Sequence, residues 1–314
     1  RPGSEQLRSG PHGSALTPVR PIPEAQHTVG GVQENSEEVT VSETAAAEYR
    51  RMWTELGLDL DRHDVLLDAL GQMYGEVYLS QVDRPQAMQY FDFVMSEVHG
   101  LRVRELVDAK KAGRKVIGSF CVFVPEELVL AVDGIAVGLC AGAEFGTEEA
   151  ERFLPLTTCA LIKSFFGFQL AKVCPYTAAC DLIVGENTCD GKKKSYEAFG
   201  DLVDELYTLD MPQRKGESGR DLLRAEYRRF AAKLEELAGR TIMAGALRES
   251  IEIVNAKRRA IARLNALRAA DPTPISGRDA LLVQQVLEAL QHLQVPLCVH
   301  APAAAGFLGG DEGY

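Results

Sequence analysis

The stretch LIVGENTCDGKKKSYE, residues 182–197, decides the fold. Its first residues form a short apolar run that is typical of a buried strand, and a turn follows. A helix is expected from about Gly191, so the stretch predicts a strand, a turn that carries Cys189, and a helix. Cys189 therefore lies directly beyond the end of a predicted strand, and its role depends on where the other cysteines lie.

The same alternation of strand and helix extends over residues 116–210. Apolar runs at residues 116–123, 135–140 and 206–209 predict three further strands, with helices in the intervening segments. Alternation of this kind is typical of a parallel sheet with crossover helices. We therefore expect an α/β fold, with a Rossmann-like parallel-sheet domain at residues 113–212.

Helical segments are expected on both sides of this domain. Residues 46–112 place apolar side chains at helix-like spacing, and residues 213–293 contain two long helical patterns and a final shorter one. Residues 1–45 are rich in Gly, Ser, Pro, Glu and Thr without an apolar period, which predicts a disordered tail.

Composition limits the partners. The chain has 314 residues, with 34 Lys and Arg against 45 Asp and Glu, which gives a formal net charge of −11. This charge argues against wholesale binding to nucleic acid or to an anionic membrane. The longest apolar runs are far too short to span a bilayer, and no secretory leader pattern is present. We expect a cytoplasmic protein with no nucleic-acid and no membrane partner.

Cysteine is concentrated in the predicted sheet domain, which contains six of the seven cysteines. The odd number argues against a secreted disulfide scaffold, and such a cluster in a cytosolic protein favours metal or redox chemistry. Cys121, Cys140 and Cys189 each lie at or just beyond the end of a predicted strand, the edge where open α/β sheets bind ligands. Cys159 lies in the first turn of a predicted helix and Cys174 follows the other end of that helix. Soft sulfur ligands at one edge suit an iron–sulfur cluster.

Other interpretations of these residues compete with a cluster. A free cysteine is often a small buried apolar residue, and Cys180 fits that description. Zinc is disfavoured because closely spaced cysteine pairs are absent and all six histidines lie outside residues 121–189. A Walker A loop is rejected because five residues separate Gly185 from Gly191 and Lys193 replaces the magnesium-binding hydroxyl.

Five segments together resemble the 2-hydroxyacyl-CoA dehydratase D-component family, and within it most closely the double-cubane-cluster-containing anaerobic reductases. The similarity extends over about residues 45–287. The segments are FCVFVPEELVLA, GLCAGAE, LPLTTCALIKSFFGF, VCPYTAACDLIVGENTCDGKKKSYE and IVNAKRRAIARLNALRAADPTPISGRDALLV.

The resemblance implies an iron–sulfur cluster, either a single [4Fe-4S] or a double-cubane cluster, held between two α/β domains. It also implies an ATP-dependent iron–sulfur activator protein as electron donor, a dimer, and a small-molecule or acyl-CoA substrate. By motif position, the candidate ligands of the metal are Cys121, Cys140, Cys159, Cys174 and Cys189. Glu126 and Lys163 adjoin the motif cysteines and are candidates for the layer around the ligands. For both, an ordinary role as helix-start acid or solvated base is an equal alternative.

The chain departs from the family pattern after residue 287. Residues 294–314 are expected to be a divergent tail, with the family's second α/β domain absent, and Cys298 in that tail is not assigned to the cluster. The activity expected is that of an anaerobic reductase of small molecules. The alternatives are a dehydratase subunit with a single [4Fe-4S] cluster that acts through a ketyl radical, and a non-catalytic scaffold or inactive fragment.

Overall fold

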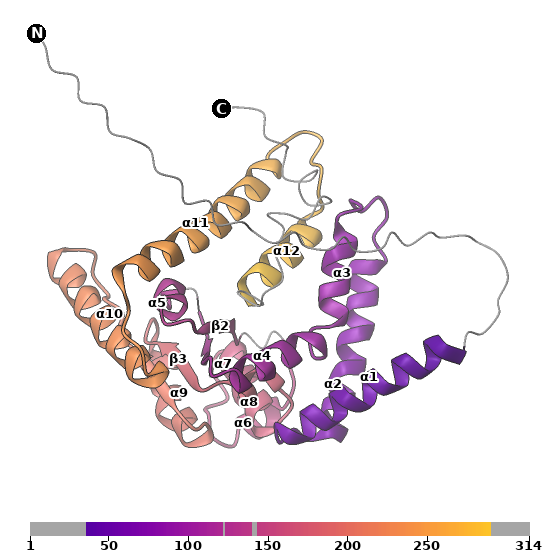
Figure 1. Cartoon of the computed structure of the whole chain (residues 1–314), viewed down its shortest axis with the longest axis horizontal. Coiled ribbons are helices and arrows are strands. Elements are labelled where there is room, and N and C mark those ends of the chain that lie inside the picture. The colour runs from indigo at the N-terminus through magenta and orange to yellow at the C-terminus, as the bar shows by residue number, and fades with distance from the viewer. Residues whose placement is uncertain (1–35, 122, 140–142, 290–314) are drawn as a thin grey trace, which may run out of the picture. The chain divides into compact units, whose positions relative to one another are not determined.

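The computed structural model describes residues 36–121, 123–139 and 143–289 (Figure 1). The described residues from Glu43 onward belong to one compact unit, and this unit contains the sheet. The first helix, α1 (Ser36–Glu55), begins earlier than the start expected near Ala46. The predicted tail at residues 294–314 and two of the cysteines, Cys140 and Cys298, lie outside the described residues.

Four parallel strands form the sheet, in the order β2-β1-β3-β4. Each strand falls within or beside an apolar run that predicted it. The α/β fold with a parallel sheet is therefore confirmed. The strands are β1 (Val116–Ser119), β2 (Ile135–Gly138), β3 (Leu182–Glu186) and β4 (Leu206–Leu209).

The strand order creates a switch point in the middle of the sheet. From β1 the chain moves to β2 on one side, and it then returns to add β3 on the other side of β1. Crossover connections that leave in opposite directions open a crevice at the carboxyl ends of the two central strands. The residues that follow β1 and β3 therefore occupy the position where open α/β sheets bind ligands.

Helices cover both faces of the sheet. Alternate side chains of a strand point to opposite faces, so Ile183 packs with one core cluster while Leu182 and Val184 pack with the other. The first face is covered by α4 (Leu101–Lys111), α7 (Ala160–Leu170), α8 (Pro175–Ala179) and α9 (Asp190–Phe199). The second face is covered by α5 (Glu126–Ala131) and α10 (Glu217–Ala238).

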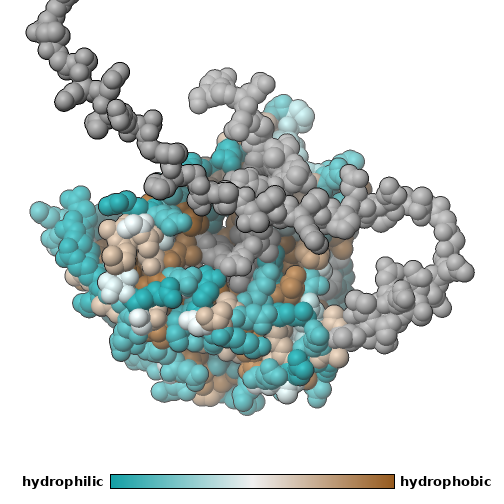
Figure 2. All heavy atoms as spheres, in the orientation of Figure 1, coloured by the Kyte–Doolittle hydropathy of each residue, from teal (hydrophilic) through white to brown (hydrophobic). Residues whose placement is uncertain are grey.

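The remaining elements flank this three-layer core. The expected long C-terminal helical patterns correspond to α10 and to α11 (Ala244–Leu267), and Gly239 ends α10 in the left-handed conformation, with φ of 65°. Figure 2 shows hydrophilic residues over most of the face that is drawn in colour, with hydrophobic ones between them. The other elements are α2 (Leu60–Tyr74), the π-helix η1 (Gly75–Leu79), α3 (Met88–Ser96), α6 (Thr147–Ala150), the 3-10 helix η2 (Gly200–Leu202), α11 (Ala244–Leu267) and α12 (Gly277–Ala289).

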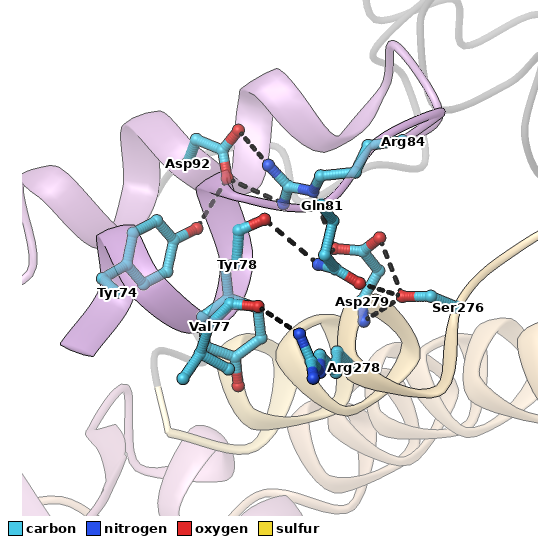
Figure 3. A network of polar contacts seen from close by, with 9 residues as sticks. All are labelled: Tyr74, Val77, Tyr78, Gln81, Arg84, Asp92, Ser276, Arg278 and Asp279. Carbon is cyan, nitrogen blue, oxygen red and sulfur yellow. Dashed lines mark hydrogen bonds and ion pairs between the residues drawn. The ribbon is translucent and has the colours of Figure 1, made fainter.

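A buried polar network joins α12 to the N-terminal helices (Figure 3). Asp279, which is 1% exposed, accepts a hydrogen bond from Arg84 Nε at 2.9 Å. The same guanidinium group donates to both carboxylate oxygens of Asp92 at 2.9 and 3.0 Å. Ser276 caps α12 by accepting the backbone N–H of Asp279 at 3.0 Å and donates to Gln81 at 2.7 Å. This network fixes two segments that lie almost 200 residues apart in the chain.

A pair of histidines, the buried His63 of α2 and the half-buried His99 just before α4, packs together in the N-terminal part of the fold. His63 Nε2 and His99 Nδ1 are 2.8 Å apart and the two rings are stacked. Trp53 packs edge-on against His63 and donates its indole N–H to the His99 carbonyl oxygen at 2.7 Å. Burial lowers the pKa of His63 to about 4 and that of His99 to about 3, so this core contains neutral imidazoles.

Candidate thiol site at the carboxyl edge of the sheet

Two cysteines flank the switch point. Cys121 lies two residues after Ser119, the last residue of β1. Cys189 lies three residues after Glu186, the last residue of β3. Because β1 and β3 are adjacent parallel strands, their carboxyl ends meet at one edge. The structure therefore brings these two thiols to the same crevice, with Cys121 half-buried and Cys189 exposed.

Three cysteines occupy the same local position, the N-cap of a helix. Cys159 precedes α7, Cys174 precedes α8 and Cys189 precedes α9. Cys189 Sγ accepts the backbone N–H of Lys192 at 3.4 Å. An N-cap side chain faces backbone N–H groups that have no partner within the helix, so a sulfur atom at this position lies in a locally positive environment.

Cys159 belongs to the same edge as Cys189. Helix α7 lies in the connection that returns from β2 to β3, so it begins near the carboxyl edge and runs back toward the amino edge. The first turns of α7 and α9 are in contact, since a Cβ on Gly191 would lie 3.0 Å from Ile162 Cδ1. Cys159 is exposed at the start of this pair of helices. We call Cys121, Cys159 and Cys189 the rim thiols.

An aromatic cluster joins the segments that carry the rim thiols. Phe120 immediately precedes Cys121, and its ring lies 4.4 Å from that of Phe165 on α7 and 6.1 Å from that of Tyr196 on α9. Phe165 and Tyr196 are stacked at 6.3 Å. These contacts connect the three segments that carry the rim thiols and hold them at one end of the sheet.

Two further thiols lie elsewhere. Cys174 follows the far end of α7, an 11-residue helix that is about 16 Å long. Its Sγ accepts the backbone N–H of Thr177 at 3.5 Å, and it lines, with Cys180, a cavity of about 320 Å³ beside the amino end of β3. Burial raises the pKa of both thiols, and for Cys180 the nearby Cys174 raises it further. The structure therefore separates Cys174 from the rim thiols, with which it was grouped as a candidate ligand.

Each rim thiol has an ion pair within a few residues. Lys163, four residues after Cys159, binds Glu151 at 2.6 Å and the Leu156 carbonyl oxygen at 2.7 Å. After Cys121, Glu126 binds Lys257 of α11 with both carboxylate oxygens at 2.7 Å. Glu126 begins α5, as expected of a helix-start acid, whereas Lys163 is buried and is not a solvated base. Both residues hold the segments next to the thiols.

The third ion pair, beside Cys189, was not anticipated from the sequence. Glu186, the last residue of β3, is fully buried and binds Lys192 through Oε1. Its Oε2 and the hydroxyl of Tyr196 are enclosed and have no hydrogen-bond partner within the described part of the chain. Burial, then the charge of Glu186, raises the pKa of Tyr196, and the thiols of Cys121 and Cys189 act in the same direction. In the sequence, the one feature that pointed to this ion pair is that an acidic residue, Glu186, directly follows the apolar run of the predicted strand.

The rim thiols agree with a thiolate-bound metal group in donor type and in their place at the sheet edge, but not in the spacing between them. The rim thiols are soft ligands at a ligand-binding edge, and two enclosed polar atoms without partners adjoin them. In the described ranges, no three His, Cys, Asp or Glu side chains are close enough together to hold a metal ion. Cys140, which follows β2, lies in the gap at residues 140–142.

The fold and the thiol edge define an α/β protein with a cysteine-bearing switch point, and sequence comparison identifies its family. Residues 121–294, more than half of the chain, match the 2-hydroxyglutaryl-CoA dehydratase D-component family. The chain belongs to this family, whose named relatives include dehydratase subunits and a reductase subunit. No described helix is long and apolar enough to cross a membrane.

Three relatives illustrate the range of the family. The chain is 38% identical over 179 residues to YjiM of Escherichia coli (strain K12), which is provisionally named a dehydratase subunit. It is 28% identical over 156 residues to the (R)-phenyllactyl-CoA dehydratase beta subunit of Clostridium sporogenes, and 26% identical over 190 residues to a benzoyl-CoA reductase subunit of Thauera aromatica. The matches cover 57%, 48% and 58% of this chain and 46%, 40% and 48% of the relatives, so the chain spans about half the length of each.

Proposed function

We propose that the chain is a subunit of an iron–sulfur anaerobic reductase of the 2-hydroxyacyl-CoA dehydratase family. In this proposal it receives low-potential electrons from an ATP-dependent iron–sulfur activator protein and reduces small molecules. The observation that carries the proposal is the placement of the rim thiols at the switch point of the sheet. Soft sulfur ligands at this edge suit iron, and a cluster would supply one-electron chemistry when bound.

Cysteines of the chain would hold the metal, and aromatic residues would exclude water from it. Cys121, Cys159 and Cys189 would hold the metal, with Cys140 as a further candidate after β2. Cys174 stays in the proposed ligand set only by motif position, because α7 separates it from Cys159. The aromatic cluster of Phe120, Phe165 and Tyr196 would exclude water from the site. Exclusion of water shifts the reduction potential of a bound group.

Metal incorporation tests this proposal directly. The purified chain is treated anaerobically with iron and sulfide, freed of unbound metal, and examined by iron and sulfide analysis and by EPR. We expect bound iron and a reduced-cluster signal in the wild-type chain. Replacement of Cys189 by Ala should lower the bound iron, whereas replacement of Cys180, which lies by the amino end of β3, should leave it unchanged. Absence of iron from the wild-type chain would reject the proposal and favour a non-catalytic scaffold or inactive fragment.

A dehydratase subunit is the second candidate function. It is supported by the similarity to the (R)-phenyllactyl-CoA dehydratase beta subunit and to YjiM, whereas the similarity to the benzoyl-CoA reductase subunit supports the reductase. The two candidates differ in substrate. A 2-hydroxyacyl-CoA incubated with the reconstituted chain, ATP and an activator should be dehydrated only if the second candidate is correct.

The proposed partners follow from the same reasoning. The activator would supply electrons, and a second subunit would complete a dimer, since the curated relatives are themselves named as subunits. Size-exclusion chromatography with light scattering, before and after addition of the activator, measures both associations.

A further inference from the structure

The loop that carries Cys121 is held by two helices from the C-terminal part of the chain. This loop connects β1 to α5 and covers residues 120–125, of which residue 122 lies outside the described part of the chain. Its Val124 is 5% exposed and packs in the core cluster that contains Phe230 and Leu234 of α10. The hydroxyl of Tyr227, also on α10, donates to the Phe123 carbonyl oxygen at 3.4 Å.

Helix α11 holds the other end of the loop through charge. Lys257 Nζ lies 2.7 Å from both carboxylate oxygens of Glu126, and Arg258 Nη1 lies 2.7 Å from Glu127 Oε1. The Lys257 and Glu126 side chains are only 13% and 19% exposed, so water screens this pair weakly. Figure 1 shows α11 running beside α5, where these contacts form.

The sheet alone does not fix Cys121. The last hydrogen bond between this chain segment and the sheet is donated by the Phe120 N–H to the Val184 carbonyl oxygen at 3.2 Å, and Cys121 lies between this fixed end and the first turn of α5. The position of α5 depends on its apolar contacts with α10 and on its two ion pairs with α11. A change in α11 is therefore expected to move Cys121 while leaving Cys189, the N-cap residue of α9, in place.

We propose that Lys257, acting through Glu126, is a positioning residue for Cys121, so that α11 sets the spacing of the rim thiols. This inference rests on the proposed role of Cys121 as a metal ligand, but its test needs no metal. The first turn of α5 contains both acids, so α11 can hold it by Lys257 at one and Arg258 at the other.

The test compares thiol reactivity within one molecule. The metal-free, folded chain is alkylated with iodoacetamide under reducing, anaerobic conditions, and labelling of each cysteine is followed by peptide mass spectrometry. In Lys257→Met, we expect the labelling rate of Cys121 to rise several-fold relative to that of Cys189, because the loop loses its charged attachment. The matched control is Lys233→Met, which removes the ion pair of Lys233 with Glu205, before β4.

Two more variants make the outcome decisive. Glu126→Gln removes the charge with little change of shape and should raise the same ratio, which covers the case in which Lys257→Met fails to fold. Exchange of the charges, Glu126→Lys with Lys257→Glu, should return the ratio toward the wild-type value. An unchanged ratio in the folded Lys257 and Glu126 variants, or an equal rise in the Lys233 control, would overturn the inference. Failure of iron to bind would instead reject the proposed function and leave this ratio unaffected.

Discussion

The ring of Tyr196 lies directly on the backbone of Gly185. A Cβ at Gly185 would lie 2.4 Å from Tyr196 Cζ, far inside van der Waals contact. This close approach puts the tyrosine hydroxyl beside the end of β3, next to Glu186 and near Cys121 and Cys189. The packing of Tyr196 therefore requires glycine at position 185. Backbone conformation does not require it, because the φ of Gly185 is not positive.

Gly185→Ala should destabilise the chain and disturb the rim thiols. The added methyl group displaces the Tyr196 ring from the stack with Phe120 and Phe165, and overpacking of a core typically costs about 1–3 kcal/mol. Urea unfolding measures the free energy. The control is Gly245→Ala in α11, where a Cβ meets nothing within 4 Å and helix propensity favours alanine. Equal stability of the two variants would contradict the packing role of Gly185.

Arg84→Met should be among the most destabilising single changes. It leaves the carboxylate of Asp279, only 1% exposed, without its cation, and loss of one partner of a buried ion pair typically costs about 3–5 kcal/mol. The midpoint of urea unfolding should fall while its slope stays constant. Arg278→Met is the control: this arginine donates to the Val77 carbonyl oxygen at 3.2 Å in an exposed contact, so its loss should cost less than about 1 kcal/mol.

The sequence was sufficient for the sheet but not for the surroundings of the thiols. Strands β1 to β4 could be predicted because buried parallel strands appear as short apolar runs. The sequence put Cys159 in the first turn of a helix and Cys189 in the turn before one, whereas the structure makes each of them the N-cap residue. The Glu126–Lys257 and Arg84–Asp279 pairs could not be predicted, because their partners are 131 and 195 residues apart and no local pattern encodes such a contact. Cys174 was grouped with the rim thiols by motif position alone, although the sequence already put it after the far end of the helix that begins at Cys159.

The histidine pair predicts a loss of stability in mild acid. Burial lowers the pKa of His63 to about 4 and that of His99 to about 3, against about 6.5 in the unfolded chain. Between these values the unfolded chain binds more protons, so stability is fully present above about pH 6.5 and is lost as the pH falls toward 4. Charged Asp64 and Arg50 adjoin His63 and partly offset each other. Going from pH 7 to pH 5 should cost on the order of 2 kcal/mol for each histidine.

Urea unfolding at pH 7 and pH 5 checks this prediction. A variant with His63→Gln and His99→Gln cannot take up these protons, so its stability should change less between the two pH values than that of the wild-type chain. Since carboxylates titrate in both proteins, the difference between the two proteins isolates the histidines. An equal pH dependence in both would show that the histidine pair does not control acid stability.

Thiol accessibility should divide the cysteines into two groups. In the metal-free, folded chain at pH 8, iodoacetamide should label Cys159 and Cys189 first, because both are exposed at helix starts. Cys174 and Cys180 should react slowly, because burial raises the pKa of both and alkylation requires the thiolate. Unfolding in urea should remove the difference, which serves as the internal control. Rapid labelling of Cys174 together with Cys159 in the folded chain would mean that the two ends of α7 are equally open to solvent, and it would restore Cys174 to equal standing as a metal ligand.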